Sequence, residues 1–457
     1  MDIKIKTYKL KMSNKFIIGT GNPDSKLIAL HVDTLSNIYA LISYRGEINL
    51  NNTLFKSNTM GVLLIKYNLE ILWIMEIGHF IDINPRRNFK ITGDDHTNGK
   101  IIIDHTDNIH ILIRFSVAFK LINIKISNIK SEAGLCYLKI LPSAKILNHK
   151  YIFGQCNKNI QLLVKNNDAF IFGSHNNNKI WFDNYDLDSN KNLFIAKLNS
   201  NSIFEWIKDI QLENSDSSIQ IFDASSNNHF FYIIGAFTGK IYFDNETIND
   251  NILDLPSHFL KYFLAILDHN GKWIKVRIPQ WSNNIQYEYP QSLSLHQDKL
   301  YITTYSIDKN TKFLDDDNNT KCPTPIQLLL ITLDLSLQDI DIKKINFNLN
   351  INYIFDLSPI IHVNDLGINI LAYFTDKITI QDIHITGYNN IIDLAFIKIN
   401  NNQLESIKVF SGFNPDHPLF ISCSNNITII SGTINGIFKS YTHTIQTLSN
   451  QFLVFYI

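Results

Sequence analysis

The sequence lacks a dominant charge. Its 457 residues include 41 Lys and Arg against 42 Asp and Glu, a formal net charge of −1. Proteins that bind nucleic acid or acidic membranes carry a clear basic excess, so this balance argues against both kinds of partner. Nowhere do about 18 apolar residues follow one another, the length that a membrane-spanning helix needs. We therefore expect no nucleic-acid partner and no membrane span.

Cysteine is scarce. The four cysteines, Cys136, Cys156, Cys322 and Cys423, lie far apart, and no Cys-x-x-Cys pair occurs that a zinc ribbon or a redox dithiol would need. Residues 1–21 mix charged with apolar side chains and lack the continuous apolar segment of a signal peptide. The prediction is four buried free thiols in a reducing compartment. That compartment is the cytoplasm or, for a viral protein of the AT-rich genome that the Asn- and Ile-rich composition indicates, the host cytoplasm or the virion.

Signatures of catalysis and metal binding are also missing. No Gly-x-Ser-x-Gly nucleophile elbow, phosphate-binding Gly-Lys-Ser/Thr loop or dinucleotide fingerprint occurs, so no motif supports a hydrolase or a nucleotide-binding protein. Asp186, Asp188 and Asn190 resemble the start of a calcium loop, but Lys191 and Lys197 replace the glycine and the closing glutamate that such a loop needs. The sequence therefore predicts no cofactor, no metal and no catalytic residue, and favours a protein that is not an enzyme.

What the sequence does contain is a repeated unit. The segment FIAKLNSNSIFEWIKDI, residues 194–210, consists of two apolar runs around a polar tip, and four variants of it follow or precede it along the chain. A second hairpin pattern precedes each copy and occurs seven times, with Asn and Asp at the tips. The flanking runs are rich in Ile, Leu, Val, Phe and Tyr, and helical periodicity is hard to find. The chain is therefore predicted to be all-β.

A short bridging motif joins the two hairpins of a unit, as in KIWFDN at 179–184 and GKIYFDN at 239–245. Hairpin, bridge and hairpin give four strands. Four-stranded antiparallel units repeated around an axis are the blades of a β-propeller.

An Ile-Lys dyad in the last strand of the unit predicts the number of blades. It recurs at intervals of about 65 to 70 residues, at Ile207, Ile274, Ile342 and Ile407. The chain ends one strand short of a further unit, and the dyad at Ile5 predicts that an N-terminal strand, residues 2–10, closes the last blade. The prediction is a single seven-bladed domain over 1–457, with approximate blades 27–77, 99–150, 159–212, 218–278, 291–346, 358–410, and 419–457 plus 2–10.

Three tryptophans, Trp73, Trp206 and Trp273, each stand one residue before this dyad or its equivalent. Large aromatic side chains dominate burial in protein cores. We therefore expect these tryptophans to pack between sheets rather than to stack on a ligand.

The order hairpin, GxIxFDN bridge, FIAKLN and EWIK resembles the SBBP-type β-propeller repeat. The match is clearest in 27–77, 159–212 and 218–278, whereas 99–150 and 291–346 have lost the tryptophan and much of the bridge. The resemblance implies a repeat propeller and no single shared activity, so no catalytic residue follows from it.

Candidate binding residues lie in the loops between units, which in a propeller surround the mouth of the central channel. Loops of more than about 12 to 15 residues without structure of their own are uncommon unless they are functional or disordered. Arginines and aromatic residues there suit a recognition surface, and the alternative is an ordinary solvated loop. The candidates are Arg86, Arg87, Asp94, Asp95 and His96 in 78–99, Trp281, Tyr287 and Tyr289 in 280–291, and His417.

Two functions remain open from the sequence. The first is a non-enzymatic scaffold that binds a protein partner through this loop face. The alternative is a propeller that binds or processes carbohydrate, with a glycan as its partner. Two carboxylates within about 10 Å in one pocket, as glycoside chemistry requires, would favour the alternative.

Overall fold

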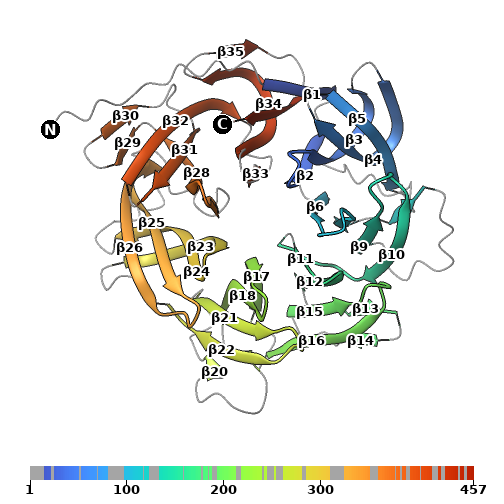
Figure 1. The fold of residues 1–457 in the computed structure, drawn as a ribbon, viewed down its shortest axis with the longest axis horizontal. Coiled ribbons are helices and arrows are strands. Elements are labelled where there is room, and N and C mark those ends of the chain that lie inside the picture. The colour runs from blue at the N-terminus through green and yellow to red at the C-terminus, as the bar shows by residue number, and fades with distance from the viewer. Residues whose placement is uncertain are drawn as a thin grey trace, which may run out of the picture.

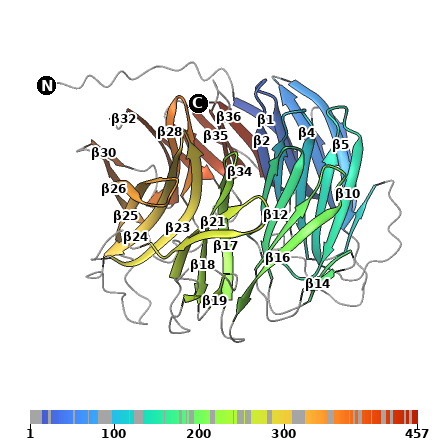
Figure 2. The ribbon, with the colours of Figure 1, turned by 60° about the horizontal axis from the view of Figure 1, so that its bottom comes forward.

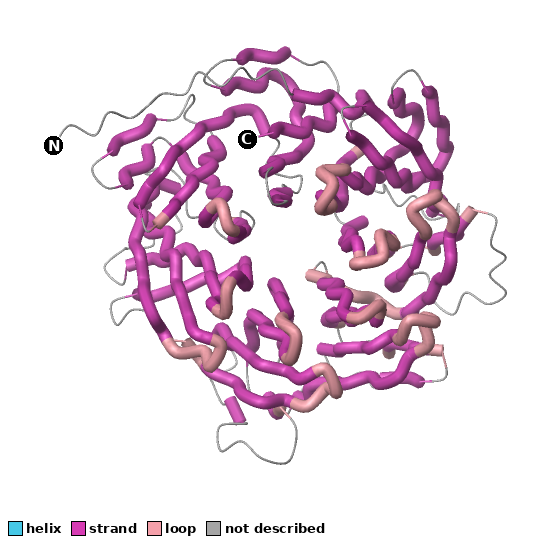
Figure 3. Tube along the Cα trace, viewed as in Figure 1, coloured by secondary structure: helices cyan, strands magenta, loops and turns pink. Residues whose placement is uncertain are grey.

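The computed structural model describes most of the chain between residues 15 and 456. The described ranges are 15–21, 25–50, 53–68, 70–80, 97–116, 118–122, 133–157, 159–175, 179–183, 185–187, 193–212, 218–238, 241–243, 252–253, 261–279, 285–308, 324–349, 359–375, 377–380, 383–386, 392–401, 403–413, 420–423, 428–440, 443–446 and 450–456. These ranges form strands, turns and short loops and contain no helix (Figure 3), which confirms the all-β prediction. They accordingly include no helix with the length and apolar character to cross a membrane.

The strands pair in antiparallel sets of four, which we call units 1 to 7. Unit 1 comprises β2 (Lys26–Val32), β3 (Ile38–Leu50), β4 (Thr53–Asn68) and β5 (Glu70–Phe80). Unit 2 comprises β6 (Thr97–Ile103), β7 (Ile109–Phe115), β9 (Gly134–Ile140) and β10 (Ile146–Phe153). Unit 3 comprises β11 (Gln161–Lys165), β12 (Asp168–Ser174), β15 (Leu193–Leu198) and β16 (Phe204–Leu212). Unit 4 comprises β17 (Ser218–Ser226), β18 (Phe230–Thr238), β21 (Lys261–Asp268) and β22 (Trp273–Arg277).

The remaining units follow the same pattern. Unit 5 comprises β23 (Ile285–His296), β24 (Lys299–Asp308), β25 (Thr324–Asp334) and β26 (Asp339–Leu349). Unit 6 comprises β27 (Ile360–Asn364), β28 (Gly367–Thr375), β31 (Ile392–Asn400) and β32 (Gln403–Phe413). Unit 7 comprises β33 (Phe420–Cys423), β34 (Thr428–Ser440), β36 (Asn450–Tyr456) and β1 (Lys15–Gly21). The seven hairpins expected from the sequence are thus the first two strands of each unit.

The units succeed one another around a common axis (Figures 1 and 2). Their first strands are spatial neighbours in a closed order, β2, β6, β11, β17, β23, β27, β33 and again β2. Apolar side chains fill the space between neighbouring sheets. Between units 3 and 4, for example, the Phe231 ring lies 4.5 Å from that of Phe170 and 5.8 Å from that of Phe172. A single sheet cannot bury both of its apolar faces, so each unit is stabilised by its two neighbours.

An N-terminal strand completes unit 7, but it is not the predicted one. The strand that pairs with β36 is β1, over 15–21, whereas the prediction placed it at residues 2–10, which lie outside the described residues. This pairing joins the two ends of the chain by backbone hydrogen bonds.

Short strands link neighbouring units. β8 (Phe119–Leu121) pairs with β5, β13 (Ile180–Phe182) with β10, β19 (Ile241–Tyr242) with β16, and β29 (Lys377–Ile380) with β26. In each case the partner is the last strand of the preceding unit. Two of these short strands, β13 and β19, lie in the bridging motifs KIWFDN and GKIYFDN. β14 (Tyr185–Leu187), β20 (Ile252–Leu253) and β30 (Ile383–Thr386) extend three of these links, and β35 (His443–Gln446) pairs with β34.

The tryptophans pack in the core as predicted, but they do not share one position. Trp206 lies opposite Lys197, whereas Trp273 lies opposite Leu267, the residue before the turn. A one-residue bulge precedes Trp206 and follows Trp273, so Trp273 takes the place of Phe204 and is 3% exposed. The similar letters EWIK and KWIK therefore conceal a shift in register.

Two of the four cysteines are described with their side chains. Cys136 and Cys156 are buried free thiols, as predicted. Cys322 and the side chain of Cys423 lie outside the part of the chain that is described.

Candidate functional site

The loop residues predicted from the sequence cannot be placed against one another. Arg86, Arg87, Asp94, Asp95, His96, Trp281 and His417 lie outside the described residues, and of Tyr287 and Tyr289 only the backbone is described. The expectation that 280–291 is a loop is wrong in its second half, because β23 begins at Ile285. Pro290 argues against a strand in the sequence, because proline cannot donate a ladder hydrogen bond. An edge strand can hold a proline at a bulge, and here the register shifts just after Pro290.

A polar pocket of ≈ 260 Å³ lies between units 5 and 6. Side chains of both units line it, and most of them can form hydrogen bonds. They include two carboxylates, one ammonium group, one imidazole, one phenol and several amides. From unit 5 come His296, Gln297, Lys299, Tyr301, Thr332, Ile340 and Asp341, and from unit 6 come Val363, Asn364, Asp365, Gly367, Ile368, Ile399 and Asn401.

Two tight turns fix the inner edge of the pocket. The β23–β24 turn has left-handed backbone at both Gln297 (φ 46°) and Asp298 (φ 59°), the geometry of a two-residue hairpin. The β27–β28 turn needs Gly367 (φ 122°), because an added Cβ would lie 2.5 Å from the carbonyl oxygen of Ile399. The turns are joined across the unit boundary, since Gln297 donates to Asp365 Oδ1 at 3.2 Å and His296 Nε2 lies 3.3 Å from the same oxygen.

The pocket exists because unit 5 departs from the repeat. Across β24, β25 and β26, Tyr301 pairs with Thr332 and Thr332 with Asp341. In unit 3 the same three positions hold Phe170, Lys197 and Trp206. The Trp206 ring lies 6.1 Å from that of Phe170 and closes the boundary with unit 4, where a Cβ on Gly271 would be 3.3 Å from the indole.

Unit 1 repeats the filled arrangement, with Tyr39, Lys66 and Trp73 at these positions. The Tyr39 and Trp73 rings are 6.3 Å apart. In unit 5 the short side chains of Thr332 and Asp341 replace a lysine and a tryptophan, and a pocket remains where those side chains would lie.

The lining of this pocket suits a ligand rich in hydroxyl groups. Asp341 and Asp365 accept hydrogen bonds, Lys299 donates them, and the amides of Asn364 and Asn401 do both. Burial raises the pKa of Tyr301, so its phenol stays protonated at neutral pH and can also donate. Metal binding has no support within the described ranges, where no group of three or more His, Cys, Asp or Glu is placed to hold an ion.

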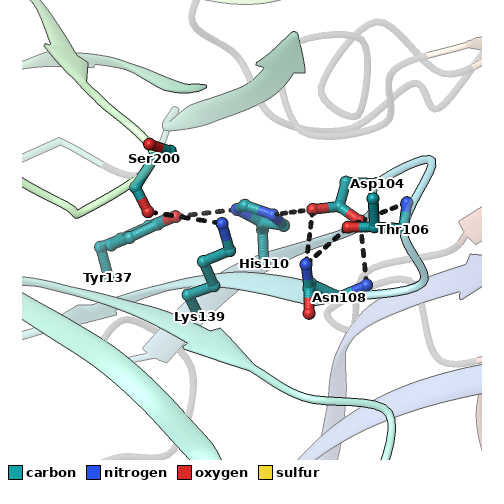
Figure 4. A network of polar contacts seen from close by, with 7 residues as sticks. All are labelled: Asp104, Thr106, Asn108, His110, Tyr137, Lys139 and Ser200. Atoms are coloured by element: carbon teal, nitrogen blue, oxygen red, sulfur yellow. Dashed lines mark hydrogen bonds and ion pairs between the residues drawn. The ribbon is translucent and has the colours of Figure 1, made fainter. Parts of the chain in front are cut away.

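A second polar cluster, in unit 2, resembles a catalytic dyad (Figure 4). His110 Nε2 lies 2.9 Å from Asp104 Oδ2, and His110 Nδ1 lies 2.8 Å from the hydroxyl of Tyr137. Asp104 also accepts from the backbone N–H groups of Thr106 and Asn108, each within 2.9 Å. Burial lowers the pKa of His110, although the bond to Asp104 opposes this shift. The neutral ring therefore donates to Asp104 and accepts from Tyr137.

This cluster stabilises a turn and is closed to substrates. His110 is 0% exposed. In unit 1 the equivalent Asp33 accepts from the N–H groups of Leu35 and Asn37, and the Tyr39 hydroxyl donates to it at 3.2 Å. The pattern Asp-x-x-x-Asn-x-His/Tyr could have been recognised from the sequence as a recurring turn.

Polar groups on the innermost strands also have structural partners. Asp223 accepts from the backbone N–H of Leu293 at 2.9 Å and from the hydroxyl of Ser292 at 3.2 Å. Ser292 in turn accepts from the N–H of Ile361 at 3.2 Å. Burial raises the pKa of Asp223, and the nearby Lys100 opposes that shift. These bonds connect β17, β23 and β27 in sequence around the axis, so these polar groups serve the fold. We therefore take the pocket between units 5 and 6 as the candidate site.

Comparison with known proteins gives only distant similarity. No family model matches the chain, and no curated protein matches its sequence. Two solved structures of a polysaccharide lyase, described as PL25 ulvan lyase, have a TM-score of 0.48. One is 11% identical and the match covers 97% of this chain and 96% of the lyase; the other, described as bound to -[GlcA(1-4)Rha3S]-, is 12% identical, with 96% and 94% covered. A Synechocystis apocarotenoid oxygenase has a TM-score of 0.38 at 7% identity, with 97% and 93% covered. All three scores lie below 0.5, a range in which overall similarity implies neither shared chemistry nor a shared ligand.

Proposed function

We propose that the seven units are the blades of a seven-bladed β-propeller and that the pocket between units 5 and 6 binds a saccharide. The closed order of the first strands and the completion of unit 7 by β1 support the propeller. Membership of the SBBP-type repeat remains a prediction. So does a protein partner on the loop face, whose residues are not described.

The observation that carries the proposal is the composition of the pocket. Sugar hydroxyl groups both donate and accept hydrogen bonds, and the lining offers carboxylates, amides, an ammonium group and a phenol within ≈ 260 Å³. Sites for small molecules place convergent polar groups among apolar and aromatic side chains, and the pocket has Tyr301, Ile340, Val363, Ile368 and Ile399 in the latter role. Asp341 and Asp365 also line this pocket as two carboxylates, which supports the carbohydrate alternative.

The test is binding of the purified protein to a panel of neutral, acidic and amino oligosaccharides, measured by calorimetry. Asp341→Trp should abolish binding without unfolding the protein, because tryptophan occupies the equivalent place in units 1 and 3. Ser406→Trp, at the equivalent half-buried position of unit 6, is the matched control and should bind normally. If no member of the panel binds, or if Asp341→Trp binds like wild type, the proposal is wrong. Release of reducing or unsaturated ends in the same mixtures would extend it from binding to processing.

A further inference from the structure

We propose that the ligand of this pocket carries a primary ammonium group, which binds between Tyr301 and Asp341. The inference rests on the proposed saccharide-binding function and names amino sugars as the ligand class.

The evidence is what other units place at the same position. In unit 3 the ammonium group of Lys197 lies 5.7 Å from the centre of the Phe170 ring, and it forms ion pairs with Asp168 at 3.1 Å and Glu205 at 2.7 Å. In unit 1 the ammonium group of Lys66 lies 5.2 Å from the centre of the Tyr39 ring. An ammonium group over an aromatic face is a recurrent, favourable contact.

Unit 5 keeps the aromatic ring of this arrangement but not the lysine, and Lys299 and Ile340 stand at the places of Asp168 and Glu205. Tyr301 occupies the place of Phe170 and Tyr39, and Thr332 occupies the place of the lysine. Asp341, at the tryptophan position next to Thr332, adds a carboxylate. Both Tyr301 and Asp341 line the pocket, so a cation from a ligand can lie where the lysine ammonium lies in the other units.

Charged groups of both signs surround this position. Asp341 and Asp365 line the pocket as carboxylates, and Lys299 lines it as a cation. Lys343, two residues from Asp341 on β26, interacts with Asp341, although burial lowers the pKa of Lys343. The lining itself therefore has two carboxylates and one ammonium group, and His296 Nε2 lies 3.3 Å from Asp365 Oδ1.

The experiment compares three tetrasaccharides of equal length, composed of glucosamine, N-acetylglucosamine and glucose, at a mildly acidic pH where the amine is protonated. We expect the glucosamine oligomer to bind at least about tenfold more tightly than the other two. Asp341→Asn should remove this preference, so that the ratio of the three affinities falls to about one whatever the variant does to the binding that all three sugars share. A lysine-containing peptide serves as a fourth probe, and tighter binding of the peptide than of the glucosamine oligomer would overturn the choice of amino sugars.

A second pair of variants separates charge from volume. Thr332→Lys restores the lysine of units 1 and 3, whereas Thr332→Met adds similar volume without charge. The lysine variant should weaken binding of the glucosamine oligomer far more than the methionine variant does, and both should remain folded. Equal binding of all three sugars to wild type, with loss of all three in Asp341→Trp, would refute the ammonium inference but leave the proposed function standing. Absence of binding by any sugar would refute both.

Discussion

The buried cluster around His110 allows a prediction of stability that uses the repeat as its own control. His110→Phe removes the donor to Asp104 and the acceptor for the Tyr137 hydroxyl, at 2.9 and 2.8 Å. A hydrogen bond to a charged group contributes about 1.5 to 3 kcal/mol and a neutral one about 0.5 to 1.5 kcal/mol. Because both partners are buried, we expect His110→Phe to lower the free energy of unfolding by about 2 to 4 kcal/mol, measured by urea denaturation at neutral pH.

The matched variant copies unit 1. His110→Tyr combined with Tyr137→Leu installs the side chains that unit 1 has at these positions, Tyr39 and Leu64. The new phenol can then donate to Asp104 as Tyr39 donates to Asp33. This double variant should lie within about 1 kcal/mol of wild type. If it is as unstable as His110→Phe, the turn interpretation of the cluster is wrong.

The hydrogen-bonded pair of His110 and Asp104 also predicts how the free energy of unfolding changes at acidic pH. The folded-state pKa of His110 is lowered, mainly by burial, from an unfolded value of about 6.5. The unfolded chain therefore binds a proton that the folded protein excludes, and stability falls as the pH drops below about 6.5, by up to about 1.4 kcal/mol per pH unit. Asp104, whose pKa is held low by its hydrogen bonds, reinforces the loss only at more acidic pH. The double variant should show a shallower slope between pH 6.5 and 5 than wild type, and equal slopes would refute the assignment.

Three further predictions concern the fold. Deletion of residues 1–21 removes β1 from the closing unit and should lower the melting temperature by several degrees, whereas deletion of 1–10 keeps β1 and should lower it less. Gly271→Ala, at φ 83° and against Trp206, should cost about 1 to 2 kcal/mol in urea denaturation, whereas Asn270→Ala in the same turn should cost less. Burial raises the pKa of the Cys156 thiol to about 12 and also that of Cys136, so neither should react with a thiol reagent until the protein unfolds; rapid labelling of the native protein would contradict the buried placement.

The pairing of strands within hairpins was the part of the fold that could be predicted best from the sequence. Apolar runs around Asn- and Asp-rich tips identify hairpins because local turn chemistry determines them. Register was harder to predict. A one-residue bulge moved Trp273 to the other face of its strand relative to Trp206, and no residue type marks a bulge reliably. The closing strand was misplaced for a related reason, since an isolated Ile-Lys pair at residues 5 and 6 is a weak signal among many apolar residues.

The pocket between units 5 and 6 could not be predicted from the sequence for a different reason. The segments LLITLD and IDIKK of unit 5 correspond to FIAKLN and EWIKD of unit 3 but lack the tryptophan. In a repeat whose side chains fill the boundary between units, a short residue in place of a long one opens space. The loss of the tryptophan was visible in the sequence, but its consequence depends on which side chains face the same boundary, and only the strand register shows that.

Replacing only the tryptophan or only the lysine by another residue does not leave a pocket between two units. Unit 2 has Asn148 at the tryptophan position but keeps Lys139, whose ammonium group reaches the carbonyl oxygen of Ser200 in unit 3 at 3.5 Å. Unit 4 has Ile266 at the lysine position, and Lys275, at the tryptophan position, donates to the carbonyl of Ser336 in unit 5 at 2.8 Å.

Unit 6 keeps its lysine, Lys398, which pairs with Glu405 at 2.9 Å. Of the six units whose side chains can be compared at these positions, unit 5 is the one with short side chains at both, Thr332 and Asp341. Restoring either long side chain should therefore reduce the pocket. This is why Thr332→Lys and Asp341→Trp, although they differ in charge and lie on different strands, are both expected to weaken binding of the same ligand. If only one of them did so, the ligand would not occupy the space that the two missing side chains share.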